Sequence, residues 1–282
     1  MNFEKTTLFL TVKDYSVSQE VFELYYNEEY DMLVTHPQPS LTQLPRYYED
    51  SNYISHTDAN TTLFEKVYQI VKKRAVKKKV TLINKLSKKG KLLDIGAGVG
   101  DFLYAAKEQG WETLGYEPND NARKIASSKG VAFTNETKNL ESNSFDVITM
   151  WHVLEHVPDL EWQLDELRRL LKPGGIVLVA VPNYKSFDAK YYKNFWAAYD
   201  VPIHFWHFSR TSIIKLFSQN NFTLIKTIPM LYDSFYVSLL SEKYKRGKMN
   251  FIKAFYIGLV SNSKGMINKE FSSHIYVLKK GK

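Results

Sequence analysis

The sequence predicts an α/β fold in which helices cover both faces of a mostly parallel β-sheet. Short apolar segments typical of strands alternate with helix-length amphipathic segments between residues 91 and 181. Repeated units of this length favour a parallel sheet that is buried on both faces. Gly110 and Gly130 follow two of the expected helices, and Lys172-Pro173-Gly174-Gly175 closes a third. Ligands of such sheets bind at the carboxyl ends of the strands.

The individual elements are expected in the following order. Strands are predicted over 92–95, 112–116, 131–134, 145–150 and 176–181, and helices over 101–109, 120–128 and 160–171. An aromatic, loop-rich insert over about 183–208 comes next, and a helix over 212–219 has Ser209 as its N-cap. Two late strands are expected over 222–228 and 274–278. The long interval between them predicts a short helix near 251–259.

A Tyr-rich N-terminal appendage over 1–59 precedes this domain. Residues 8–12 and 21–25 read as short strands. A long helix then begins near 58–62, because apolar residues recur every three to four positions as far as Leu86. We therefore divide the chain into a small β-rich appendage, 1–59, and a main domain, 60–282.

The net charge of +8 comes from one segment. Eleven Lys or Arg and no acid lie between Lys66 and Lys91, so the remaining residues sum to −3. Most of these lysines fall off the apolar stripe, which favours a solvated helix face over a site for an anionic partner or a membrane surface. The chain has no Cys, which excludes disulfides and thiolate chemistry. No apolar stretch reaches the ~20 residues that span a bilayer, and we expect a soluble cytoplasmic protein.

The segment Leu92–Phe102, LLDIGAGVGDF, carries the sharpest functional signal. An apolar strand enters a turn with glycines at positions 96, 98 and 100, where a ligand can approach the backbone closely. A dinucleotide-binding fingerprint would place its third glycine at position 101, which is Asp101. The next strand ends at Glu117, whose carboxylate can accept hydrogen bonds from both ribose hydroxyls of a nucleoside.

These segments, together with SFDVITMWHVLEHVPDLEWQLDELRRLLKPGG and IVLVAVPN, resemble the class I S-adenosylmethionine-dependent methyltransferases. The nearest branch is similar to enzymes of ubiquinone biosynthesis and of sugar or polyketide tailoring. The resemblance covers roughly residues 63–278. It implies a Rossmann-like, seven-stranded sheet whose last strand is antiparallel, and S-adenosylmethionine as cofactor, with S-adenosylhomocysteine as product.

The resemblance also implies roles for single residues. The methionine end of the cofactor would be lined by Asp94 and by the turn with Gly96, Ala97, Gly98 and Gly100, beside Phe102. Glu117 would hold the ribose and Pro118 would pack near the adenine. Either Glu136 or Thr137 would contact the adenine amino group, and Trp151 would border cofactor and substrate.

Five side chains are candidates for a general base: His152, His156, His204, His207 and Asp233. His156 is the first choice and His204 the second, with His152 also assigned to the catalytic group. Pro202–Ser209 matches a Pro-x-His-x-x-His-Phe-Ser stretch of the relatives, which supports His204. We expect no metal site, because no carboxylate cluster at ligand spacing accompanies the histidines.

Two other segments have expected roles near the substrate. The aromatics of the insert form the wall or lid of an apolar pocket, or they belong to the core. Pro37-Gln38-Pro39 and Tyr47-Tyr48 resemble the end of a zinc module that precedes this domain in some relatives. Without Cys, the appendage would be a metal-free remnant of such a module.

The expected function is methyl transfer to the oxygen or carbon of a small or lipid-like acceptor. One alternative is a catalytically silent subunit or sensor that binds S-adenosylmethionine. Another is an RNA methyltransferase that uses the basic helix, although the acidic remainder of the chain makes a nucleic-acid partner unlikely. Peripheral membrane contact stays open, and the sequence leaves the oligomeric state undetermined.

Overall fold

The computed structural model describes residues 3, 6–48 and 63–281. The chain divides into two compact units. The first unit consists of Met1–Asp50, His152–Leu164 and Val179–Leu278, and the second consists of Ser51–Trp151, Asp165–Leu178 and Lys279–Lys282.

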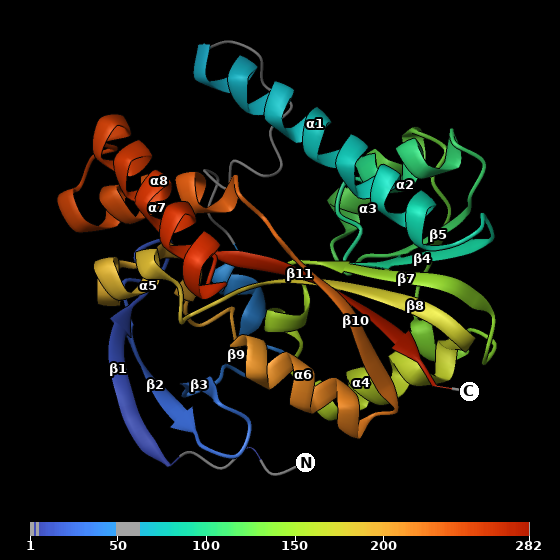
Figure 1. The fold of residues 1–282 in the computed structure, drawn as a ribbon, viewed down its shortest axis with the longest axis horizontal. Coiled ribbons are helices and arrows are strands. Elements are labelled where there is room, and N and C mark those ends of the chain that lie inside the picture. The colour runs from blue at the N-terminus through green and yellow to red at the C-terminus, as the bar shows by residue number, and fades with distance from the viewer. Residues whose placement is uncertain (1–2, 4–5, 49–62, 282) are drawn as a thin grey trace. The chain divides into compact units, whose positions relative to one another are not determined.

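The predicted seven-stranded sheet is confirmed (Figure 1). Its strand order is β10-β11-β8-β7-β4-β5-β6. β4 pairs in parallel with β5 and β7, and β5 pairs in parallel with β6, whereas the last strands are antiparallel. The strands are β4 (Lys91–Ile95), β5 (Glu112–Tyr116), β6 (Phe133–Thr134), β7 (Phe145–Trp151), β8 (Leu171–Pro182), β10 (Phe222–Pro229) and β11 (Ser273–Lys280).

The helices between these strands follow the predicted pattern. They are α2 (Asp101–Lys107), α3 (Asp120–Ser128) and α4 (Leu160–Leu170), and α1 (Leu63–Leu86) precedes β4. The predicted start of α1, near 58–62, lies outside the described residues. Asn119 caps α3 by accepting a hydrogen bond from the Ala122 amide. Ser209 caps α6 (Arg210–Gln219), as expected, and it also forms a capping box with Ser212.

The N-terminal residues form an antiparallel sheet that includes a strand from the insert. β1 (Thr7–Lys13) and β2 (Val21–Asn27) were expected, but β3 (Met32–His36) was not. β3 pairs with β9 (Trp206–His207), far away in the sequence. β3 was not predicted because it lacks the usual polar–apolar alternation of a strand. Its four consecutive residues 32–35 are all buried.

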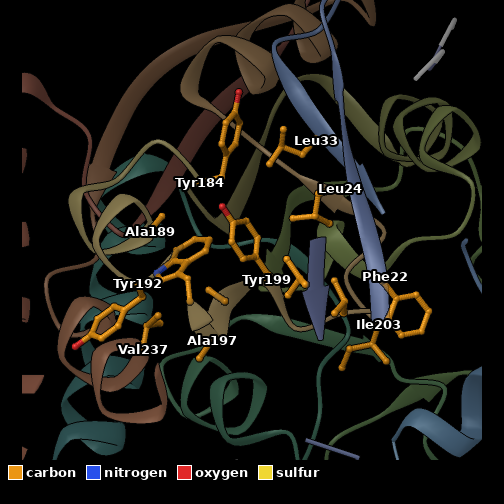
Figure 2. Packing of buried hydrophobic residues seen from close by; sticks show 14 of the residues in the cluster. Phe22, Leu24, Leu33, Tyr184, Ala189, Tyr192, Ala197, Tyr199, Ile203 and Val237 are labelled. Carbon is orange, nitrogen blue, oxygen red and sulfur yellow. The ribbon is translucent and has the colours of Figure 1, made fainter. Parts of the chain in front are cut away.

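The insert 183–208 is more structured than its loop-rich sequence indicated. It contains α5 (Phe187–Tyr192) and two 3-10 turns, Lys193–Phe195 and Ala197–Tyr199. Seven of its ten aromatic side chains are buried, and several pack with apolar residues of β2, β3 and α7 (Figure 2). The buried Asp188 carboxylate accepts hydrogen bonds from Trp196 Nε1, Ser261 Oγ and Ser272 Oγ. Most of these aromatics are therefore part of the core of the first unit.

The C-terminal region departs from the prediction in its helix content. Two helices, α7 (Asp233–Arg246) and α8 (Phe251–Asn268), lie between β10 and β11. α8 has 18 residues, twice the predicted span, and α7 was not expected. α8 was underestimated because its apolar residues are interrupted by buried Ser261, Asn262 and Gly265, which do not resemble the core face of a helix.

Candidate functional site

The glycine turn after β4 has three residues in the left-handed region. The φ angles are 72° at Gly96, 53° at Gly98 and 75° at Gly100. A Cβ at Gly100 would lie 2.7 Å from the Cβ of Ala126, so this glycine permits close packing of the turn on α3. A Cβ at Gly98 would meet nothing within 4 Å. Gly98 therefore borders open space that a ligand can occupy.

The turn satisfies several of its own backbone donors. Gly96 N–H and Ala97 N–H donate to the carbonyl of Tyr116, and Gly100 N–H donates to the carbonyl of Ala97. The N–H of Gly98 donates to Oε2 of Glu117, 2.8 Å away. These four groups are not offered to a phosphate, which a dinucleotide-binding turn would require. The turn therefore suits a ligand that makes contact mainly through shape and through side-chain acceptors.

Glu117 is fixed at the end of β5 by two backbone amides. Besides the contact with Gly98, its Oε1 accepts a hydrogen bond from the Asn119 amide at 2.9 Å. A carboxylate has about four lone-pair sites, so about two remain for a ligand. The side chain is half-buried. It is oriented toward the glycine turn and retains acceptor capacity for a pair of hydroxyl groups.

Asp94 is buried near the carboxyl end of β4. Its Oδ1 accepts a hydrogen bond from Thr149 Oγ1 on β7 at 2.5 Å. Burial raises the pKa of Asp94 to about 7, against the opposing effects of the Thr149 hydrogen bond and the Lys79 charge. Such a carboxylate gains from a cationic ligand, because a positive charge compensates for the lost hydration.

The charge of Asp101 is neutralised within the protein. Its carboxylate forms ion pairs with Lys72 at 2.8 Å and Lys129 at 2.6 Å. Burial opposes ionisation, but hydrogen bonds from both lysines outweigh it and lower the pKa of Asp101. Because its charge is neutralised, Asp101 would not repel a pyrophosphate, and only the missing third glycine and the engaged amides disfavour a dinucleotide here. Lys72 also belongs to the basic helix, so part of that charge is used internally.

The other predicted cofactor residues lie in the second unit with the turn. The buried Phe102 packs edge-on against Trp151 with ring centroids 5.4 Å apart, and Lys79 Nζ lies 4.3 Å from the Trp151 ring centroid. Pro118 is exposed. Of the two alternatives for the adenine contact, Glu136 is exposed and pairs with Lys138 at 3.1 Å, whereas Thr137 is buried. Glu136 has the more accessible side chain.

His152 is the first residue of the segment His152–Leu164 of the first unit, and its backbone is left-handed, with φ of 58°. Its Nδ1 lies 3.3 Å from Glu155 Oε1, and its Nε2 lies 3.1 Å from Asp233 Oδ2. Burial would lower the pKa of His152, but the two carboxylates outweigh it and raise the pKa to about 10. At neutral pH this imidazole therefore holds its proton, which argues against His152 as a base.

His156 and His204 come together with their rings in edge contact, 4.4 Å between centroids. Nδ1 of His156 lies 3.0 Å from the Ile203 carbonyl, and Nδ1 of His204 lies 3.0 Å from the Ala198 carbonyl. A carbonyl only accepts, so each Nδ1 carries the hydrogen and each Nε2 keeps a lone pair. Burial lowers the pKa of both histidines, and both are neutral at pH 7. Only His156 is partly exposed.

The remaining candidate, His207, has a structural environment. Its Nε2 lies 2.9 Å from Thr35 Oγ1, and that hydroxyl also lies 2.6 Å from the His204 carbonyl. The hydroxyl donates to the carbonyl and therefore accepts from Nε2 of His207. Burial lowers the pKa of His207 to about 3. The ring is thus a neutral donor that connects β3 to the insert.

The sequence analysis did not identify several polar residues around Asp94 and around the histidines. Thr149 and Lys79 surround Asp94, and Glu155 links His152 to the other histidines. Glu155 has one buried oxygen, Oε2, with no hydrogen-bond partner among the described residues. Glu155, His156 and His204 each offer an atom within 4.8 Å of the others, the spacing of metal ligands. In the sequence, only the position of Glu155 beside His156 could have indicated this role. An acidic residue at that position is equally typical of the first turn of a helix.

Comparison with known proteins agrees with this fold and glycine turn. A family model described as a methyltransferase domain matches residues 68–227. This span is more than half of the chain, and the chain belongs to that methyltransferase family. The resemblance seen in the sequence is thereby confirmed.

Individual relatives share only part of the sequence with this chain. A demethylmenaquinone methyltransferase of Staphylococcus aureus is 32% identical over 120 residues, which cover 36% of this chain and 50% of that protein. The chain thus spans about half the length of the curated relatives it matches. A methyltransferase structure from Archaeoglobus fulgidus covers 74% of this chain and 94% of its own, with 18% identity and a TM-score of 0.53. One from Thermotoga maritima, described as a possible histamine N-methyltransferase, covers 77% and 94%, with 20% identity and a TM-score of 0.51. These structures share the fold.

Proposed function

We propose that this protein transfers a methyl group from S-adenosylmethionine to the oxygen or carbon of a small or lipid-like acceptor. The observation that carries the proposal is the pair formed by Gly98 and Glu117. An oriented carboxylate with spare acceptor sites touches a turn that borders open space. This arrangement fits a neutral nucleoside whose ribose carries two hydroxyl donors.

The charge of the second unit fits the other end of the cofactor. Asp94 is a buried carboxylate whose ionisation is opposed by its surroundings, and an ammonium group beside it would compensate for that cost. Lys79 lies over the Trp151 ring and acts electrostatically on Asp94, which is suitable for the carboxylate of a methionine tail. The bound cofactor supplies an electrophilic methyl on a sulfonium, and the protein must orient the acceptor and remove its proton.

We assign proton removal to His156. It is neutral, partly exposed, and held by the Ile203 carbonyl so that Nε2 retains a lone pair. The buried His204 ring packs against the His156 ring, and His204 is the second candidate. His152, charged and paired with Asp233 and Glu155, orients Glu155 rather than taking a proton.

A methyl-release screen tests the proposal. The protein is incubated with S-adenosylmethionine and with quinols, sugars or lipids, and S-adenosylhomocysteine formation is followed. A positive acceptor is then used with His156→Gln, which should lower turnover by roughly 10²–10⁴-fold with cofactor affinity unchanged. His207→Gln is the matched control. Cofactor binding without turnover on any acceptor would instead favour the silent subunit, and equal activity of His156→Gln and wild type would refute the base assignment.

The demethylmenaquinone methyltransferase relative supports a lipid-like acceptor over a nucleic acid, since its name refers to a quinone. The basic helix gives less support to RNA than its charge indicated, because Lys72 pairs with Asp101 and Lys79 contacts Trp151.

A further inference from the structure

α8 has its large apolar side chains on the wrong face for a helix of a protein core. The buried face consists mainly of small or polar residues, namely Ala254, Ile257, Gly258, Ser261, Asn262 and Gly265. The exposed face, here called the α8 face, consists of Phe251, Ile252, Phe255, Tyr256, Leu259, Met266 and Ile267. A surface helix of a globular protein normally has the opposite distribution.

The small residues explain why the apolar side chains cannot turn inward. A Cβ at Gly258 would lie 2.6 Å from Phe235, and one at Gly265 would lie 2.6 Å from Phe271. α8 thus packs tightly against its own unit through these glycines, and this packing fixes the rotation of the helix. Ile252 and Ile267 remain 86% and 84% exposed. An apolar face of this extent is typical of a binding surface.

The α8 face lies in a segment of the chain that is rich in positive charge. From Lys243 to Lys269 the chain contains seven Lys or Arg and no Asp or Glu. Lys245 and Lys253 lie over the ring of Tyr191, at 5.4 and 5.7 Å, and Lys264 lies 4.0 Å from the ring centroid of Phe187. Such contacts orient the lysines without cancelling their charge.

We propose that the α8 face binds the surface of an anionic phospholipid bilayer. Aromatic and aliphatic side chains between lysines are the pattern of helices that lie in the headgroup region, where apolar burial and attraction to anionic lipids act together. A second copy of the chain is disfavoured as the occupant, because a symmetric contact would bring two such basic clusters together. Among the described residues, no helix is long and apolar enough to cross a bilayer, so the protein would lie on the membrane through this helix.

If the α8 face binds a bilayer, the methyl acceptor would be a lipid that the protein reaches from the bilayer surface. Only this statement about the acceptor rests on the proposed function. Membrane binding itself is independent of methyl transfer. The two claims can therefore fail separately: vesicle binding tests the α8 face, and cofactor binding tests the second unit.

The test is co-sedimentation with vesicles of phosphatidylcholine alone or mixed with phosphatidylglycerol. We expect wild-type protein to bind the mixed vesicles and to bind less at high salt. The triple variant Ile252→Ser, Phe255→Ser, Ile267→Ser should lose at least about tenfold in binding. The charge reversals Lys248→Glu and Lys264→Glu should each lose about fivefold or more.

A matched triple variant controls for the loss of exposed apolar surface in general. Val21→Ser, Leu41→Ser and Ile225→Ser replace side chains that are 59%, 70% and 51% exposed elsewhere in the first unit, and binding should be unchanged. Both triple variants should retain cofactor affinity by calorimetry. Equal binding by the two triples, or no preference for phosphatidylglycerol, would overturn the proposal. A dimer that only the α8 variant dissociates would assign the face to a second copy.

Discussion

Comparing Gly98→Ala with Gly247→Ala distinguishes two effects of an added methyl group. One is the loss of stability from an unfavourable backbone conformation, and the other is the loss of space for the ligand. Gly98 and Gly247 both have positive φ, 53° and 73°, and a Cβ at either would meet nothing within 4 Å. The left-handed conformation costs an L-residue about 1–2 kcal/mol. We therefore expect Gly98→Ala and Gly247→Ala to lower the free energy of unfolding by the same amount.

Only Gly98→Ala should affect the cofactor. Its methyl group enters the space next to Glu117, so we expect affinity for S-adenosylmethionine to fall at least tenfold, or about 1.4 kcal/mol. Gly100→Ala differs again, because its Cβ would meet Ala126 at 2.7 Å. Overpacking adds about 1–3 kcal/mol to the backbone cost there.

Urea unfolding and calorimetry measure the two effects on the same samples. We expect Gly100→Ala to be the least stable variant, and Gly98→Ala and Gly247→Ala to match each other in stability but not in cofactor affinity. Wild-type affinity in a folded Gly98→Ala protein would refute the placement of the cofactor at this turn.

The structure gives four further predictions. Glu117→Ala should weaken the binding of S-adenosylmethionine by at least about 100-fold in calorimetry, because two charged hydrogen bonds of about 1.5 kcal/mol or more are lost; unchanged affinity would show that the ribose does not lie at Glu117. Asp94 has its pKa raised to about 7 and must be ionised to pair with an ammonium, so affinity should rise with pH through 7, and a flat profile would contradict the pairing. Asp188→Ala leaves three buried donors unpaired and should cost about 3 kcal/mol or more in urea unfolding, with cofactor affinity retained. Burial lowers the pKa of His207 to about 3 and of His274 to about 4, so their contribution to stability is present above about pH 6.5 and is lost as pH falls toward those values; His207→Gln should therefore lose less stability than wild type between pH 7 and pH 5, and an equal loss would argue against a neutral buried ring.

The fold was predictable from the sequence where each element has its own local signal. Gly110 and Gly130 end two helices by backbone chemistry, and α3 was predicted with its observed bounds. β3 and α7 were not predictable in this way. β3 is stabilised by pairing with β9, about 170 residues later, and α7 packs against α5 and α8 without a clear apolar period of its own.

The site residues likewise differ in whether local sequence predicts their surroundings. Glu117 and the glycine turn follow from sequence spacing, because a strand–turn–helix unit places them within a few residues of each other. The environment of the histidines does not, since it depends on contacts between distant segments. His152 acquires its charge from Asp233, 81 positions later in the sequence, and no local pattern distinguishes it from the neutral His156.

If the glycine turn and Glu117 form the cofactor site, the second unit binds a nucleoside with an amino-acid tail and not a dinucleotide. Calorimetric titration of the wild-type protein with S-adenosylmethionine, repeated in the presence of NADH, measures this directly. We expect one S-adenosylmethionine to bind per chain, S-adenosylhomocysteine to bind similarly, and NADH to displace neither. Heat on addition of NADH, with none on addition of S-adenosylmethionine, would contradict it.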